Sequence, residues 1–368
     1  MALLEVQAAD VQEQLHELGW TDGLPVVEPT PERVEAMVDG AGRDRTELLG
    51  GVAERGIAVN VEQAASNAVL AGCRPEYFPV VLAGVEAMLD PRYNAHSALT
   101  STGGSALCAI VSGPIAAEIG MNARHNVLGS GNRANMTIGR ALRLIARNVL
   151  DARTGRLDGS SIGSPAKISL CFAEDPPRPP WQPLHSALGF AATDTTVTLL
   201  ATEGPRQVAN HLRGDAASVL RTFAEAIRSP AGFIAGKGGQ VVVLLGPEHA
   251  LALIEGGVSR RQAQEFLVAH TRIPPAELEA AGIGIELGSQ HDMVPESDGL
   301  LATLASPDDV FIVTAGGEGA GWSAVMPVWA PAKHSRAVTR RVRPYGEALP
   351  DCGPDACEVN LSPIEGAL

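Results

Sequence analysis

The segment from His125 to Asn148 reads H-N-V-L-G-S-G-N-R-A-N-M-T-I-G-R-A-L-R-L-I-A-R-N and changes from a glycine-rich loop to a helix. Ile138, Leu142 and Ile145 recur at helical spacing, which predicts an apolar face packed into a core. A glycine loop that leads into a helix offers free N–H groups and the positive end of the helix dipole, and both suit an anion. The same residues are also typical of a tight turn whose polar side chains cap a core helix, so both interpretations stay open.

Outward from this segment, the chain contains a degenerate internal repeat. Segments 85–120 and 223–257 both run from a helix through a proline and a Gly-Gly pair into an apolar strand, a Gly-Pro pair and a short helix. The matching pairs are Gly103-Gly104 with Gly238-Gly239 and Gly113-Pro114 with Gly246-Pro247. The repeat predicts an α/β fold of two related, internally duplicated units about a pseudo-twofold axis. Chance similarity between two βα units is the alternative.

The length of 368 residues allows two domains. We expect an N-terminal α/β unit over 1–175, a proline-rich linker over 176–194, a second α/β unit over 195–320, and C-terminal strands with a surface tail over 321–368. The linker is indicated by E-D-P-P-R-P-P-W-Q-P from Glu174, because each proline fixes its own backbone angle and restricts the residue before it. Local patterns predict a strand over 24–27 and helices over 11–18, 31–38, 61–71, 75–89, 133–149 and 260–270.

Composition limits the kinds of partner. A net charge of −14 and an aromatic content of 4% argue against nucleic-acid binding, which needs a basic surface. No stretch approaches the roughly 20 apolar residues of a membrane span, and the N-terminus lacks the pattern of a signal peptide. Five cysteines do not suggest a disulfide framework, so we expect a cytoplasmic protein, with a homo-oligomer left open.

Candidate binding residues lie in glycine-rich loops, whose backbone N–H groups can approach an anion closely. Arg133 would add a permanent charge whose forked geometry matches a carboxylate. The candidates are Gly129, Ser130, Gly131, Asn132, Arg133, Asn135, Thr102, Gly103, Gly104, Gly238 and Gly317. A turn without a ligand is the alternative for each loop.

The candidate catalytic residues are His125, Lys237 and Ser101, which lie in or next to these loops. A histidine can move a proton near neutral pH, although His125 could equally be a capped or surface residue. Neither the phosphate-binding nor the dinucleotide-binding glycine pattern is matched, and no zinc motif is present. We therefore expect no cofactor and no metal.

Three segments resemble a family of uncharacterised bacterial proteins. They are L-P-V-V-E-P-T-P-E-R-V from Leu24, N-A-V-L-A-G-C-R-P-E-Y-F-P-V-V-L-A from Asn67, and G-S-G-N-R-A-N-M-T-I-G-R-A-L-R-L from Gly129. The similarity spans most of the chain and includes the strand–proline opening and the asparagine-rich glycine loop. It implies a bacterial cytoplasmic α/β protein and brings no reaction, cofactor or catalytic residue.

The leading hypothesis is an enzyme that acts on a small anionic, carboxylated metabolite by acid–base chemistry, as a lyase or hydrolase. One alternative is a thiol-dependent redox component that uses Cys352 and Cys357, or Cys73. Another is a non-catalytic ligand-binding or complex-forming subunit.

Overall fold

The computed structural model describes residues 10–211, 214–283 and 293–343, and it shows the expected mixed α/β protein. Within these residues, the main sheet has eight strands and a separate hairpin has two. The strands of the main sheet are β3 (Ala106–Ser112), β4 (Leu170–Ala173), β5 (Thr196–Thr202), β6 (Arg206–Ala209), β7 (Gly239–Leu245), β8 (Val310–Thr314), β9 (Trp322–Pro331) and β10 (Val338–Arg341).

The pattern of parallel and antiparallel pairing in the main sheet is the same when it is followed from either edge. Its central path is β4-β3-β5-β9-β7-β8. β3 is parallel to β4 and antiparallel to β5, and β7 is parallel to β8 and antiparallel to β9. The middle contact is one residue pair, Thr202 with Val328. β10 adds to β5 and β6 adds to β9, so we distinguish a first half-sheet (β4, β3, β5, β10) and a second half-sheet (β8, β7, β9, β6).

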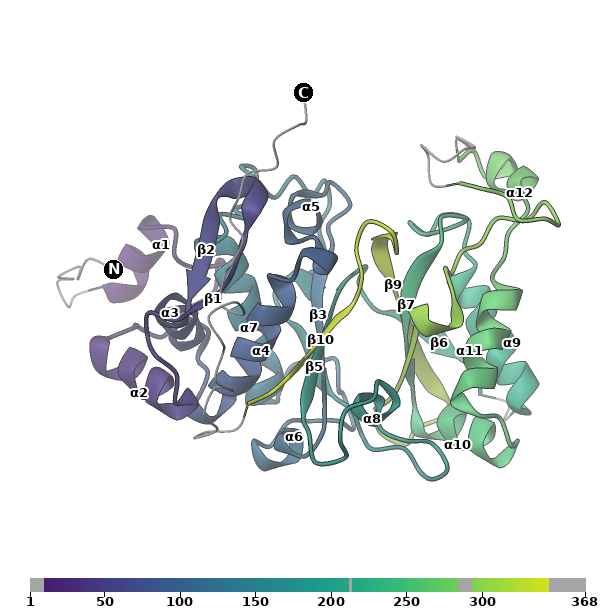
Figure 1. Ribbon diagram of the computed structural model, residues 1–368, viewed down its shortest axis with the longest axis horizontal. Helices are drawn as coiled ribbons and strands as arrows, with labels where there is room; N and C mark the ends of the chain where they lie inside the picture. Colours follow the sequence, from purple (N-terminus) through teal and green to yellow (C-terminus); the bar gives the residue numbers. More distant parts are fainter. Residues whose placement is uncertain (1–9, 212–213, 284–292, 344–368) are drawn as a thin grey trace, which may run out of the picture.

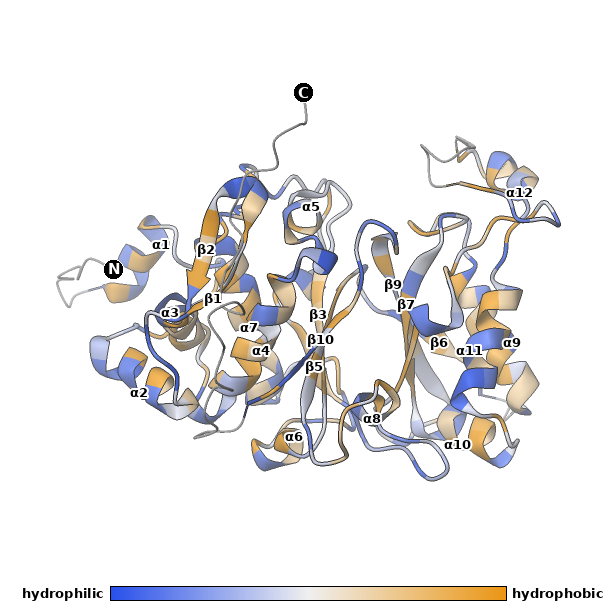
Figure 2. Ribbon diagram, viewed as in Figure 1, coloured by the Kyte–Doolittle hydropathy of each residue, from blue (hydrophilic) through white to orange (hydrophobic). Residues whose placement is uncertain are grey.

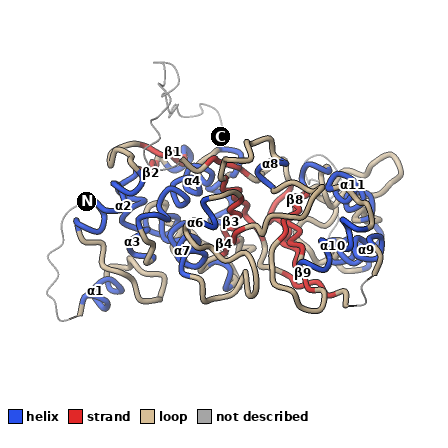
Figure 3. The backbone as a smooth tube through the Cα atoms, turned by 90° about the horizontal axis from the view of Figure 1, so that it is seen from below, coloured by secondary structure: helices blue, strands red, loops and turns tan. Residues whose placement is uncertain are grey.

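The two half-sheets face each other between two layers of helices (Figure 1; Figure 3 gives the view from below). Successive side chains of a strand point to opposite faces. Accordingly, Leu107, Ala109 and Val111 of β3 pack into a core with the N-terminal helices. The alternate residues, Ala106, Cys108 and Ile110, belong to the core that includes the second half-sheet. Figure 2 shows apolar strands at the centre and polar residues on the outer helices.

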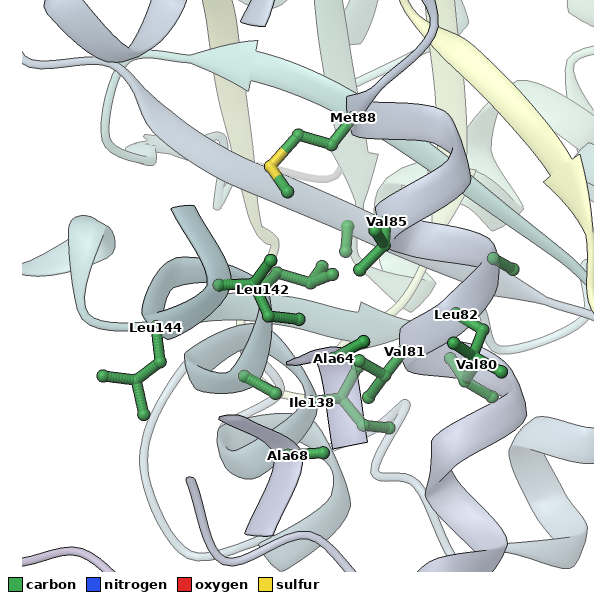
Figure 4. Packing of buried hydrophobic residues seen from close by; sticks show 14 of the residues in the cluster. Ala64, Ala68, Val80, Val81, Leu82, Val85, Met88, Ile138, Leu142 and Leu144 are labelled. Carbon is green, nitrogen blue, oxygen red and sulfur yellow. The ribbon is translucent and has the colours of Figure 1, made fainter. Parts of the chain in front are cut away.

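The first helical layer contains α2 (Pro31–Ala41), α3 (Val61–Ala71), α4 (Phe78–Met88) and α7 (Arg133–Asn148). Leu142 of α7 is fully buried, and Figure 4 shows it near Val85 and Met88 of α4. A Cβ at Gly84 would lie 2.9 Å from Leu142 Cδ2, so this glycine allows α4 and α7 to approach closely. The apolar face predicted for the helix after the glycine loop is thus confirmed.

Helix boundaries follow capping residues. α3 begins at the capping box of Asn60 and Gln63 and ends at Gly72, with φ +89°, as predicted. α2 begins after Thr30, as predicted, but continues beyond the expected end near residue 38. Its terminator is Gly42, which has the left-handed φ of +62°, because a single glycine inside a helix weakens it without ending it.

The remaining helices of the first half are α1 (Val11–Glu17), α5 (Ala95–Thr100), α6 (Ile115–Glu118) and α8 (Leu184–Ala187), and the hairpin is β1 (Leu48–Val52) with β2 (Ile57–Asn60). The second half contains α9 (Ala216–Ile227), α10 (Pro247–Glu255), α11 (Arg260–His270) and α12 (Pro275–Ala280). Short 3-10 helices lie at Ala53–Arg55, Pro75–Tyr77, Pro91–Tyr93, Pro165–Lys167 and Pro307–Asp309.

The strand predicted over 24–27 is wrong, because these residues form no ladder. The backbone N–H and carbonyl of Val26 are both bonded to the side-chain amide of Gln12, at 3.0 and 2.6 Å. A side chain therefore satisfies the backbone groups that a neighbouring strand would otherwise pair.

Each parallel strand pair has a Gly-Pro corner at its carboxyl end. Gly113 follows β3 with φ +127°, and a Cβ there would lie 2.6 Å from Thr195 Cα. Gly246 follows β7 and packs against the backbone carbonyl of Trp322 in the same way. The helices after the corners, α6 and α10, lie with α8 at one end of the molecule (Figure 1).

Candidate active site

Two cavities lie at this end of the molecule. The β3–β4 cavity, of about 320 Å³, opens beside the first corner and is walled by Glu174 and His185. The β7–β8 cavity, of about 670 Å³, opens beside the second corner. Both cavities have Asp175 and Pro176 in their walls, so they adjoin one another.

A buried polar cluster forms part of the β3–β4 cavity. Ser112 is the last residue of β3, Glu174 directly follows β4, and His185 lies in α8. Their exposed fractions are 0%, 6% and 3%. Ser112 Oγ lies 2.5 Å from Glu174 Oε2 and 2.7 Å from His185 Nδ1, so the hydroxyl connects the carboxyl group to the imidazole.

Each end of this cluster has one polar atom without a partner. Within the described part of the chain, Glu174 Oε1 and His185 Nε2 are buried and neither atom makes a hydrogen bond of ordinary geometry, although the backbone of Ala192 acts electrostatically on the His185 ring. Glu174 Oε2, by contrast, also accepts the backbone N–H of Leu184 at 2.7 Å. Buried polar atoms are normally paired, so two orphan atoms on side chains that line one cavity indicate a place for a ligand.

Burial favours the neutral form of both side chains. It raises the pKa of Glu174, although the hydrogen bonds from Ser112 and Leu184 act in the opposite direction. It lowers the pKa of His185, although the backbone of Ala192 and the carboxylate of Asp194 favour the protonated ring. A carboxylic acid and a neutral imidazole at one cavity are suited to acid–base chemistry.

Sequence reasoning did not find this cluster. Ser112 ends an apolar strand, and Glu174 and His185 lie in or beside the stretch interpreted as a connector. The available signal was the position of Glu174 directly after a buried strand, where ligand sites of α/β proteins are common.

Of the predicted site residues, His125 and Gly317 are brought together in the wall of the β7–β8 cavity. The ring of His125 lies directly over Gly317, so close that a side chain at position 317 would overlap it. Arg124 and Arg178 line the same cavity, and Arg124 pairs with Asp175 at 3.6 Å. The glutamates of this cavity, Glu248 and Glu318, make it mixed in charge.

The glycine loop from Gly129 to Asn135, including Ser130 and Gly131, lines neither cavity. Asn132 caps α7 by accepting the N–H of Asn135 at 3.0 Å, and the Asn135 side chain bonds both backbone groups of Asn122. Arg133 Nε donates to the carbonyl of Gly72 at 3.0 Å. These contacts are those of the capping interpretation.

The other predicted residues lie at the amino ends of β3 and β7, away from both cavities. Ser101 Oγ accepts the N–H of Gly103, and the carbonyl of Thr102 accepts the N–H of Ser161. Gly103 and Lys237 both contact Phe233, and Lys237 Nζ lies 5.0 Å from its ring centre. Gly104 and Gly238 occupy left-handed turns in the same region, with φ +73° and +64°. His125 therefore lies apart from Ser101 and Lys237, which both lie near Phe233.

A buried ionic cluster adjoins the Ser101 loop. Asp158 is 2% exposed and pairs with Arg143 at 2.5 Å and with Lys167 at 2.7 Å. Burial alone would raise the pKa of Asp158, but hydrogen bonds from Lys167 and Ser160 outweigh it and hold the pKa at about 2. With its carboxylate fully paired, the cluster is structural in character.

Three cysteines of the described chain are buried and free, namely Cys73, Cys108 and Cys171. Burial raises the pKa of Cys73 to about 12, which makes it a poor nucleophile near neutral pH. Cys352 and Cys357 lie outside the described residues. In residues 10–211, 214–283 and 293–343, no group of histidine, cysteine and acidic side chains is placed to hold a metal ion.

Fold and site together define a mixed α/β protein with a buried carboxyl–hydroxyl–imidazole cluster at the carboxyl ends of parallel strands. No protein family model matches the chain, and no curated protein matches it. The resemblance to uncharacterised bacterial proteins therefore stays a prediction. No helix among the described residues has the length and apolar character needed to cross a membrane.

Proposed function

We propose that this protein is an enzyme that acts on a small carboxylated metabolite by acid–base chemistry without a nucleotide cofactor. The observation that carries the proposal is the pair of unpartnered buried atoms, Glu174 Oε1 and His185 Nε2, on side chains of one cavity. One atom can deliver a proton while the other removes one. A lyase reaction fits this arrangement, because elimination takes a proton from carbon and gives one to the leaving group.

The substrate's charge is the second part of the proposal. Arg124 and Arg178 line the adjoining β7–β8 cavity, and α10 begins there without a side-chain cap. A carboxylate between the two arginines would leave the rest of a small substrate near the shared wall at Asp175. We prefer these two arginines to Arg133 as the proposed anion-binding residues, because Arg133 lines neither cavity and its Nε donates to the carbonyl of Gly72.

To test the proposal, the protein is incubated in D2O with a panel of 2-hydroxy, 2-amino and α,β-unsaturated carboxylates. Proton NMR follows the conversion of each compound and the exchange of its carbon-bound protons for deuterium. Turnover or deuterium incorporation is expected for at least one compound, with a loss of about 100-fold or more in Glu174→Gln and His185→Asn. If the whole panel stays unchanged, or if both variants retain the wild-type rate, the proposal is wrong.

The second half of the chain provides a matched control. His249 Nδ1 lies 2.7 Å from Ser323 Oγ, as His185 Nδ1 does from Ser112 Oγ. Its Nε2, however, contacts the carbonyl of Asn210 at 3.2 Å, and His249 lines neither cavity. His249→Asn should therefore keep the activity that His185→Asn loses.

We further propose that the two halves arose by duplication. The pattern of strand pairing and the two Gly-Pro corners support this. A backbone superposition of β3–α6 on β7–α10 in an experimental structure tests the idea, and unrelated paths after the strands would refute it.

A further inference from the structure

Ser112 has a fixed number of hydrogen-bonding positions, and its neighbours use all of them. A serine hydroxyl donates one hydrogen bond and accepts two. Ser112 Oγ accepts the backbone N–H of His185 at 3.2 Å and also contacts Glu174 Oε2 and His185 Nδ1. One acceptor position and one donor position remain for these two atoms, so the hydroxyl must donate to one and accept from the other.

With Glu174 and His185 both neutral, the form that their burial favours, two arrangements of protons satisfy this condition. In the first, His185 Nδ1–H donates to Ser112, the Ser112 hydroxyl donates to Glu174 Oε2, and the carboxyl proton is on Oε1. In the second, Glu174 Oε2–H donates to Ser112, the hydroxyl donates to His185 Nδ1, and the ring proton is on Nε2. Both arrangements contain three protons, and all three side chains are neutral in each.

We propose that Ser112 is a positioning residue that relays protons between Glu174 and His185, which deepens the proposed function and rests on it. A proton from substrate carbon binds His185 Nε2, while the Nδ1 proton moves to Ser112 Oγ. The hydroxyl proton moves to Glu174 Oε2, and the Oε1 proton passes to the leaving group. The first arrangement becomes the second, and no side chain is left charged.

The physical advantage is the avoidance of buried charge. Without the relay, the same reaction leaves an imidazolium and a carboxylate in a site where both side chains are more than nine-tenths buried. Separating charge in such a site is costly. A water molecule in the cavity then restores the first arrangement, because it gives a proton to Glu174 Oε1 and takes one from His185 Nε2.

The hydrogen-bonded connection from Glu174 through Ser112 to His185 can be tested without a substrate. Nitrogen NMR of labelled histidine reports which ring nitrogen of His185 carries the proton. In Glu174→Gln, the N–H of Leu184 requires the amide oxygen at the former Oε2 position. Ser112 must then donate to this oxygen and accept from His185, so the ring proton of His185 should be on Nδ1. In the double variant Glu174→Gln with Ser112→Ala, this preference should disappear. Ser323→Ala with Glu174→Gln is the matched control and should keep the Nδ1 proton, because Ser323 contacts His249.

An unchanged His185 tautomer in the Ser112 variant would overturn the relay whether or not a substrate is known. With a carboxylate that the D2O panel has shown to react, Ser112→Ala should lower kcat at least tenfold with little change in KM, and Ser112→Thr should restore part of it. A wild-type rate for Ser112→Ala, with Glu174→Gln inactive, would refute the relay and leave the acid–base proposal standing. A panel that yields no turnover would instead count against the proposed function. The NMR measurement would still show whether Ser112 connects Glu174 to His185.

Discussion

Replacing Asp158 by asparagine should cost about 3 kcal/mol of unfolding free energy at neutral pH. The carboxyl pKa of about 2, against an ordinary value of 3.8, corresponds to about 2 kcal/mol in favour of the ionised, paired form. The variant also leaves Arg143 and Lys167, whose side chains are 11% and 14% exposed, without their shared counter-charge. Breaking such a buried pair typically costs about 3–5 kcal/mol.

The stabilisation by Asp158 should also depend on pH in a predictable direction. Because folding lowers the pKa of Asp158, its stabilisation is present above about pH 4 and is lost as the pH falls towards about 2. Urea denaturation of wild type and Asp158→Asn at several pH values should therefore show a difference that narrows on acidification. Asp308→Asn is the control, because the Asp308 side chain, which pairs with Arg261 at 2.6 Å, is 84% exposed and the pair should therefore contribute little to stability. A loss below about 1 kcal/mol for Asp158→Asn, or a difference that widens in acid, would refute the reasoning.

Three further outcomes are expected. Leu142→Ala should lower the unfolding free energy by about 3–4 kcal/mol in urea denaturation, because Leu142 is fully buried between helices; a loss below about 1 kcal/mol would contradict the packing. Gly113→Ala should be far more destabilising than Gly120→Ala, although both glycines have positive φ, because only Gly113 has backbone atoms where its Cβ would lie; equal melting temperatures would contradict this. Cys73 and Cys108, whose pKa values burial raises to about 12, should not react with a thiol reagent in the folded protein at about pH 8, and fast labelling would show that one is accessible.

Local chemistry made several elements predictable. α11 has the predicted bounds of 260–270, and α3 has both of its predicted ends, because caps such as Asn60 and Gly72 act within a few residues. The strands predicted after residue 321 are also present, as β9 and β10. The pairing partners were beyond local reasoning: β5, assigned to the second unit from the sequence, pairs along its whole length with β3.

The site was harder to predict for the same reason. Glu174 and His185 lie 62 and 73 residues after Ser112 in the sequence, and none of the three residues belongs to a recognisable motif. Asparagine and arginine near a glycine loop suggested a binding site, but such side chains serve equally well as caps, as Asn132 does here. Only the fold shows which buried polar atoms are unpaired.

The exchange of edge strands affects how the molecule can be divided. The chain leaves β5 of the first half-sheet to form β6 of the second, and later leaves β9 of the second half-sheet to form β10 of the first. A fragment cut anywhere between the halves would lack a strand that its sheet requires, and it would expose unpaired backbone along β5 or β9. The two halves are therefore interlocked, and a split version of the gene should give soluble protein only when both pieces are produced together.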